Sequence, residues 1–122
     1  MAVFIPATAS AWFEIPVTDM GRAQAFYGAV LKNELALNED GPNPIAIFAS
    51  QERGAAGHVY PGKPAAAGTG PTIHLRVSAP LEEAMERVTK HGGQVVSPVI
   101  TVPVGSFVYC LDPDGNSFGL FV

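Results

Sequence analysis

Residues 74–98, HLRVSAPLEEAMERVTKHGGQVVSP, and residues 106–121, SFVYCLDPDGNSFGLF, are the stretches that decide the fold. Apolar residues alternate at the start of the first stretch, which predicts a half-buried strand. The following segment carries apolar residues at three- and four-residue steps and ends at Gly92 and Gly93, a pattern typical of a helix and its C-terminus. In the second stretch, DPDGN (residues 112–116) separates two apolar runs, so we expect an antiparallel hairpin.

The first half of the chain repeats this design. Residues 12–31, WFEIPVTDMGRAQAFYGAVL, begin with an alternating run that predicts a strand, and Asp19 then suits the N-cap of a helix over residues 20–31. Residues 14–17 overlay residues 74–77 at an offset of 60 residues, close to half of the chain. Further strand-sized apolar runs lie at residues 45–49, 57–60, 94–96, 107–111 and 118–122.

This internal repeat predicts an α+β fold of two βαβββ modules, whose strands form a curled mixed sheet around a cleft. We expect a single domain over residues 1–122, with module one at about 10–62, a flexible linker at about 61–71 and module two at about 72–122. A ferredoxin-like sandwich also fits two helices, but it leaves several of the predicted strands unused.

Composition and charge narrow the classes of function. The chain has 122 residues, of which 48% are hydrophobic and 15% charged, a balance that suits a folded globule. Its formal charge of −4 and scattered basic residues disfavour nucleic acid as a partner. No apolar run approaches the roughly 20 residues that span a bilayer. Cys110 is the one cysteine, so we expect it to be a small core residue and the protein to be cytoplasmic.

The quoted stretches are similar to those of the vicinal oxygen chelate superfamily, which includes glyoxalases, bleomycin-resistance proteins and dioxygenases. Metal-dependent members hold a divalent ion with four side chains in the cleft. The resemblance puts Trp12, Thr72 and Gly119 at three of those positions, and His58 near the fourth. Since Trp and Gly cannot ligate a metal, the resemblance implies a metal-free subset without a cofactor.

Side-chain alternation predicts which residues line the cleft. Trp12 and Glu14 share one face of the first strand, and His74 and Arg76 share the corresponding face in module two. Glu14 and His74 are the candidate catalytic residues, although Glu14 and Arg76 could instead form a structural ion pair, and His74 could be a satisfied cleft histidine. The candidate ligand-binding residues are Trp12, Thr72, Arg76, Tyr109, Gly119 and Phe121.

Three functions fit these residues. The first is a module that binds a small, partly apolar or aromatic molecule. The second is a metal-independent enzyme, lyase- or isomerase-like, in which Glu14 or His74 moves a proton and Arg76 stabilises an oxyanion. The third is a domain that acts through a protein partner. The resemblance implies a homodimer in each case, because two-module members usually complete their clefts across two chains.

Overall fold

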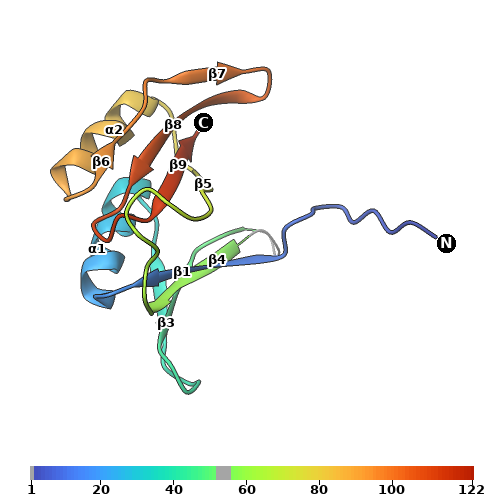
Figure 1. The fold of residues 1–122 in the computed structure, drawn as a ribbon, viewed down its shortest axis with the longest axis vertical. Helices are drawn as coiled ribbons and strands as arrows, with labels where there is room; N and C mark the ends of the chain where they lie inside the picture. The colour runs from blue at the N-terminus through green and yellow to red at the C-terminus, as the bar shows by residue number, and fades with distance from the viewer. Residues whose placement is uncertain (1, 52–55) are drawn as a thin grey trace.

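A computed structural model describes residues 2–51 and 56–122 (Figure 1). Module one comprises β1 (Trp12–Val17), α1 (Met20–Leu31), β2 (Leu35–Asn38), β3 (Ile45–Phe48) and β4 (Ala56–Pro61). Module two comprises β5 (Ile73–Arg76), α2 (Leu81–Lys90), β6 (Gln94–Val95), β7 (Ile100–Val102), β8 (Gly105–Leu111) and β9 (Ser117–Phe121).

Each module forms its own mixed sheet. The strand order is β1-β4-β3-β2 in module one and β5-β9-β8-β6 in module two, where β7 also pairs with β8. In both modules the first strand runs parallel to the last, β1 beside β4 and β5 beside β9. The predicted α+β fold of two similar modules is confirmed. The strands differ from the prediction in two respects. Among the described residues they form two sheets instead of one, with β1 and β5 as separate edge strands. Module two also has four strands after its helix, because β7 adds a short strand that pairs with β8.

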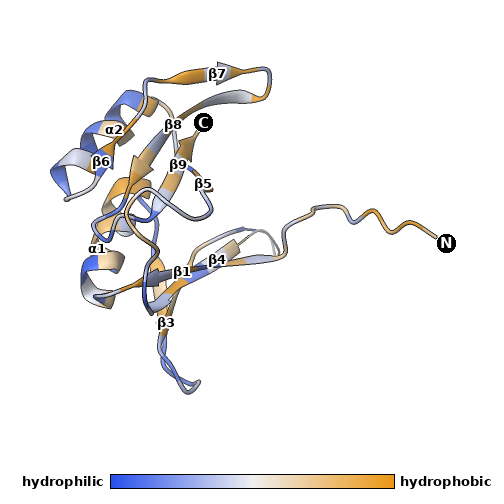
Figure 2. Ribbon diagram, in the orientation of Figure 1, coloured by the Kyte–Doolittle hydropathy of each residue, from blue (hydrophilic) through white to orange (hydrophobic). Residues whose placement is uncertain are grey.

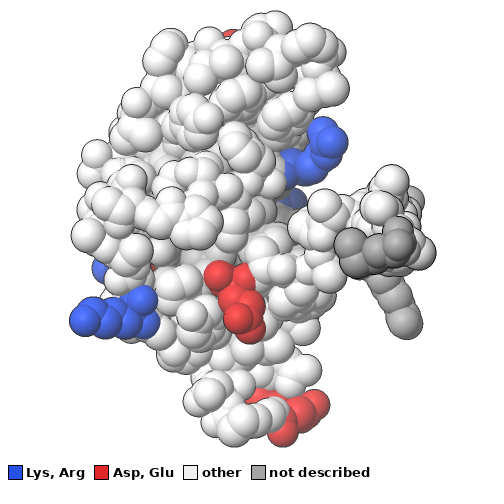
Figure 3. Space-filling model, turned by 45° about the vertical axis from the view of Figure 1, so that its right-hand side comes forward, with Lys and Arg blue, Asp and Glu red and all other residues white. Residues whose placement is uncertain are grey.

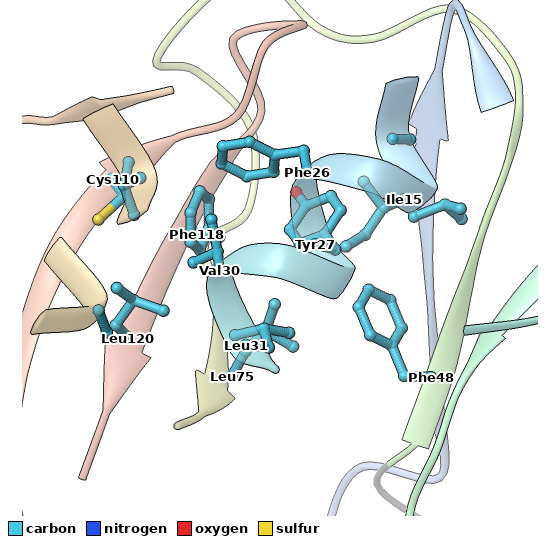
Figure 4. Packing of buried hydrophobic residues seen from close by; sticks show 14 of the residues in the cluster. Ile15, Phe26, Tyr27, Val30, Leu31, Phe48, Leu75, Cys110, Phe118 and Leu120 are labelled. Atoms are coloured by element: carbon cyan, nitrogen blue, oxygen red, sulfur yellow. The ribbon is translucent and has the colours of Figure 1, made fainter. Parts of the chain in front are cut away.

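Helix α1 lies between the two sheets and joins their cores (Figures 1 and 4). Phe26 and Tyr27 on this helix each make an edge-to-face contact with Phe118 of β9, at ring-centroid distances of 5.8 and 5.5 Å. Tyr27 also contacts Phe48 of β3, at 5.4 Å. One hydrophobic cluster therefore runs from module one through the helix into module two.

The helix boundaries follow the sequence signals. Asp19 accepts a hydrogen bond from the backbone N–H of Arg22 (2.9 Å), so the predicted N-cap is confirmed. The DPDGN turn joins β8 and β9 as the predicted antiparallel hairpin. Sequence analysis assigned no strand to β2 or β7. β2 is mostly exposed and lacks alternating burial, and β7 alternates over only three residues, which is too short a run to indicate a strand.

Polar side chains of the DPDGN turn tie the two modules together. The hydroxyl of Tyr27 donates to Asp112 (2.6 Å), which is 4% exposed. Burial, followed by the negative charge of Asp112, raises the pKa of Tyr27 well above its usual value, so this hydroxyl remains a donor. Asp114 accepts from Arg22 (2.8 Å), and Asn116 donates to the backbone carbonyl of Pro16 (2.8 Å). The turn therefore fixes module two against the β1–α1 corner.

Cys110 is fully buried in β8, as expected for a core residue. Burial raises the pKa of its thiol from 9.0 to about 12. The side chain is therefore a neutral thiol near neutral pH, which is unsuited to nucleophilic attack.

Apolar residues are concentrated where the helices face the sheets, whereas α2 turns a hydrophilic side outward (Figure 2). The segment before β1 is an exception, since it extends away from both sheets and exposes Val3, Phe4 and Ile5 by 82–84%. In the described part of the chain, no helix has the length and apolar character needed to cross a membrane.

Candidate functional site

The face of the module-two sheet that is turned away from α2 carries four aromatic rings. Strand β9 lies between β5 and β8, so residues of the three strands on this face line up in rows that run across the sheet. His74, Gly119 and Tyr109 are neighbours in the first row, and Arg76, Phe121 and Phe107 in the second. We call this surface the aromatic wall, and it consists of His74, Phe107, Tyr109 and Phe121.

Gly119 makes the aromatic wall continuous. Its missing side chain lets the rings of His74 and Tyr109 approach each other across β9, with centroids 5.7 Å apart. A Cβ at Gly119 would overlap Nδ1 of His74 and lie 2.6 Å from its Cε1. Behind this row, Phe107 and Phe121 lie nearly parallel, at an interplanar angle of 4° and a centroid distance of 5.8 Å. The wall is thus a packed aromatic surface and not a set of isolated rings.

Arg76 and Thr72 stand at the border of the aromatic wall. The guanidinium carbon of Arg76 lies 5.5 Å from the centroid of the Phe121 ring, a cation–π distance. The hydroxyl of Thr72 is 2.6 Å from that of Ser117, so it is already engaged within the protein.

A second polar cluster lies on the module-one sheet. The indole N–H of Trp12 donates to Nδ1 of His58 (2.8 Å), and Nε2 of His58 is 3.4 Å from a carboxylate oxygen of Glu14. Because Nδ1 accepts a hydrogen bond, the proton of the neutral imidazole is on Nε2, facing Glu14. His58 is 8% exposed, whereas the side chain of Glu14 is 65% exposed. This arrangement orients Trp12 and leaves the Glu14 carboxylate accessible.

The structure divides the predicted site residues between the two sheets. Five of them belong to the module-two surface, namely His74, Arg76, Tyr109, Gly119 and Phe121. The structural ion pair between Glu14 and Arg76, which the sequence left open as an alternative, is not formed among the described residues: Glu14 lies beside His58 on β4, and Arg76 contacts the ring of Phe121. The pairing failed because β1 and β5 are not neighbours in either sheet.

Two residues of these surfaces were not among the predicted site residues. His58 was considered only as a residue near the fourth metal position, although its register opposite Glu14 makes it the partner of both Trp12 and Glu14. Phe107 was assigned to a strand but not to the site. Its position two residues before Tyr109 is the signal that could have placed it on the same face.

Two small cavities lie between the modules. The larger, of about 160 Å³, reaches from His74 and Arg76 to apolar side chains that include Phe13, Phe48 and Leu75. The smaller, of about 110 Å³, lies between β1 and β5 and is bordered by the linker residues Ala65, Thr69, Gly70 and Pro71. The linker is held against the hairpin turn by a hydrogen bond from the backbone N–H of Gly68 to the carbonyl of Gly115 (3.0 Å).

A comparison with models of known protein families identifies the family to which the chain belongs. The model of the glyoxalase/bleomycin resistance protein/dioxygenase superfamily matches residues 9–120, which is most of the chain. The protein belongs to this superfamily. The vicinal oxygen chelate resemblance is therefore confirmed. No curated protein sequence matches the chain.

Solved structures of other proteins share the fold. A glyoxalase/bleomycin resistance protein from Albidiferax ferrireducens T118 superimposes with a TM-score of 0.72 at 20% identity, covering 93% of this chain and 98% of that chain. The fosfomycin resistance protein FosX from Mesorhizobium loti gives 0.67 at 18% identity, covering 97% and 92%. TnmS3, an antibiotic binding protein from Streptomyces sp. CB03234, gives 0.66 at 21% identity, covering 97% and 98%.

The positions implied for the superfamily's metal ion do not carry a suitable donor set. Trp12 has an indole N–H and no lone pair to offer, and Gly119 has no side chain, its space being filled by His74. The Thr72 hydroxyl is hydrogen-bonded to the hydroxyl of Ser117, and Nδ1 of His58 accepts a hydrogen bond from the indole N–H of Trp12. In the described ranges, no group of three His, Cys, Asp or Glu side chains is arranged to hold a metal ion. The residues present therefore do not fit the metal.

Charge is sparse on the face shown in Figure 3. Its basic side chains lie in separate places, and the larger part of the surface is uncharged. This distribution offers no continuous basic stripe on that face for a phosphate backbone.

Proposed function

We propose that this superfamily member binds a small, partly apolar or aromatic molecule in a metal-free cleft, using the aromatic wall as its principal contact surface. The observation that carries the proposal is the junction of His74 and Tyr109 over Gly119, where the two rings meet at an interplanar angle of 59°. It leaves a partly exposed aromatic surface at a position where metal-dependent relatives have a metal-binding side chain. Aromatic planes of this kind favour stacking with flat ligands.

The fold of TnmS3, described as an antibiotic binding protein, supports a binding role for the same architecture. FosX, described as a fosfomycin resistance protein, extends this support to a second small molecule. We infer a cytoplasmic site of action, since the lone buried cysteine gives no sign of an oxidising compartment.

We further propose that two copies pair to complete the cleft. In the described chain, β1 and β5 each pair with one strand, so each sheet presents an open edge. An unpaired edge is a template for a strand of another chain. A two-fold dimer that joins β1 of one copy to β5 of the other would bring the Trp12 cluster of one copy opposite the aromatic wall of its partner.

The dimer is tested by size-exclusion chromatography with light scattering at micromolar concentration. The expected mass is about twice that of one chain. A monomer over the whole concentration range would contradict the shared cleft.

Ligand binding is tested with uncharged planar aromatics, namely naphthalene-2-carboxamide, carbazole and phenazine, by titration calorimetry of chelator-treated protein. We expect saturable binding of at least one probe, unchanged when zinc, nickel, manganese or iron(II) is added. Tyr109→Ala should weaken it about three- to tenfold, because a stacking contact contributes roughly 0.5–1.5 kcal/mol.

Phe4→Ala is the matched control for this titration, since it removes an aromatic ring that is 84% exposed and lies on the extended segment before β1. It should leave affinity unchanged. Absence of binding for all three probes and for naphthalene-2-carboxylate, or binding that requires a metal, would overturn the proposed function.

A second function, metal-independent proton transfer, is favoured by the contact between Glu14 and His58 (3.4 Å). The sequence suggested either Glu14 or His74 as the residue that moves the proton, and the neighbour of Glu14 within one chain is His58. Glu14 would act as the base and His58 would hold its carboxylate. Deuterium exchange at a carbon beside a ligand carbonyl, lost in Glu14→Gln while binding is retained, would favour this enzyme over a binding module.

A further inference from the structure

Arg76 is an isolated charge within the module-two sheet. Among the described residues, the five strands of this sheet contain no Asp or Glu, and Arg76 is their only Lys or Arg. The aromatic wall is thus bordered by one fixed cation and by no fixed anion on its own strands. A surface of this composition favours a negatively charged ligand over a positive or zwitterionic one.

The described arginines differ in how their guanidinium groups are used. Arg22 donates to Asp114 and Thr18, and Arg87 donates to the backbone carbonyl of Val30 (3.0 Å). Arg76 has the ring contact with Phe121, and no protein carboxylate of the described residues lies within ion-pair distance of it. Its N–H donors therefore remain available to a ligand or to water.

The ring of Phe121 packs against the guanidinium group of Arg76. Stacking on an aromatic face restricts the arginine side chain without occupying its N–H groups, because these point outward in the plane of the guanidinium. A carboxylate can accept two parallel hydrogen bonds from such a fork. Arg76 is thereby suited to hold one anionic group at the border of the aromatic wall.

Space for the rest of the ligand lies directly beside Arg76. The cavity of about 160 Å³ is lined by His74 and Arg76 and by apolar residues that include Phe13, Phe48 and Leu75, together with polar residues such as Asn33. A cavity of roughly this volume has room for a benzene ring. Arg76, the aromatic wall and this cavity of mixed lining therefore meet at one place.

We propose that the ligand of this cleft is a planar aromatic acid, whose carboxylate binds Arg76 while its rings lie between the aromatic wall and the adjoining cavity. This inference rests on the proposed binding function and specifies its ligand class. It requires an anionic group on the ligand, whereas the binding function by itself does not.

The test compares naphthalene-2-carboxylate with its uncharged analogue, naphthalene-2-carboxamide, by titration calorimetry at neutral pH. The carboxylate should bind at least tenfold more tightly. Arg76→Gln should weaken carboxylate binding about tenfold or more and leave carboxamide binding unchanged, because a hydrogen bond to a charged group contributes about 1.5–3 kcal/mol. Arg76→Lys should restore part of the preference for the carboxylate, because lysine supplies the positive charge but lacks the planar, bidentate N–H donors of a guanidinium.

Lys90→Gln is the matched control, because it removes one positive charge from the end of α2. It should preserve the preference for the carboxylate. Equal affinity for the two probes, or a carboxylate preference that survives in Arg76→Gln, overturns the aromatic-acid inference and leaves the binding function standing. If neither these probes nor the other uncharged aromatics bind, the binding function itself fails, and this inference fails with it.

Discussion

Replacing Phe118 by alanine is expected to lower the free energy of unfolding by about 3–5 kcal/mol. Phe118 is fully buried in β9 and packs edge-to-face against Phe26 and Tyr27 of α1. Because α1 lies between the sheets, this ring is one of the places where module two contacts the helix of module one, together with Arg87 of α2, which donates to the carbonyl of Val30 (Figure 4). The alanine variant leaves a cavity at that contact, which the surrounding sheet and helix can fill only in part.

Urea denaturation followed by circular dichroism measures this loss. Val104→Ala is the control, since Val104 is 81% exposed and its truncation should change stability by less than about 0.5 kcal/mol. A loss below 1 kcal/mol for Phe118→Ala would show that the two modules are not held together through this ring.

Substituting alanine for Gly119 is expected to destabilise the protein by about 1–3 kcal/mol, the usual cost of overpacking. The added methyl group would overlap the imidazole of His74, which must then leave its place beside Tyr109. The aromatic wall would lose its continuity, so binding of a flat aromatic probe should weaken together with stability. Thermal denaturation and titration with naphthalene-2-carboxamide measure the two effects.

The double variant Gly119→Ala with His74→Ala distinguishes a local clash with the imidazole from a general sensitivity of β9 to substitution at Gly119. Removing the imidazole should make the Gly119 substitution nearly neutral relative to His74→Ala alone, since the two residues are directly coupled. Gly41→Ala is the glycine control, because the nearest atom to a Cβ there is 3.9 Å away. A full loss that persists in the double variant would contradict the explanation.

The helices and their ends could be predicted because their signals are local. Asp19 caps α1 by accepting from the backbone three residues later, a contact that needs no other part of the chain. The DPDGN hairpin is equally local. Strands β2 and β7 were missed because a short edge strand is defined by its hydrogen-bonded neighbour and not by its own apolar pattern.

The sequence predicted on which face of its strand each site residue lies, but it did not predict which of these residues contact one another. Alternation placed Glu14 and Arg76 on the correct sides of their strands. The ion pair considered as an alternative for these two residues does not form within the described chain, because pairing depends on which strands are neighbours, and β1 lies beside β4. That register gives Glu14 the partner His58, 44 positions away by the difference of their numbers, and no spacing rule links two such residues.

The sequence by itself determined the repeated modules, the positions of α1 and α2, and the absence of suitable metal donors at Trp12 and Gly119. These features depend on residue type and on short-range periodicity, which the chain carries before it folds. Only the tertiary structure decided that Gly119 brings His74 against Tyr109, and that no carboxylate of residues 2–51 and 56–122 pairs with Arg76. Those contacts join strands that are distant in sequence, so their geometry is set by sheet register and by the packing of α1 between the two sheets.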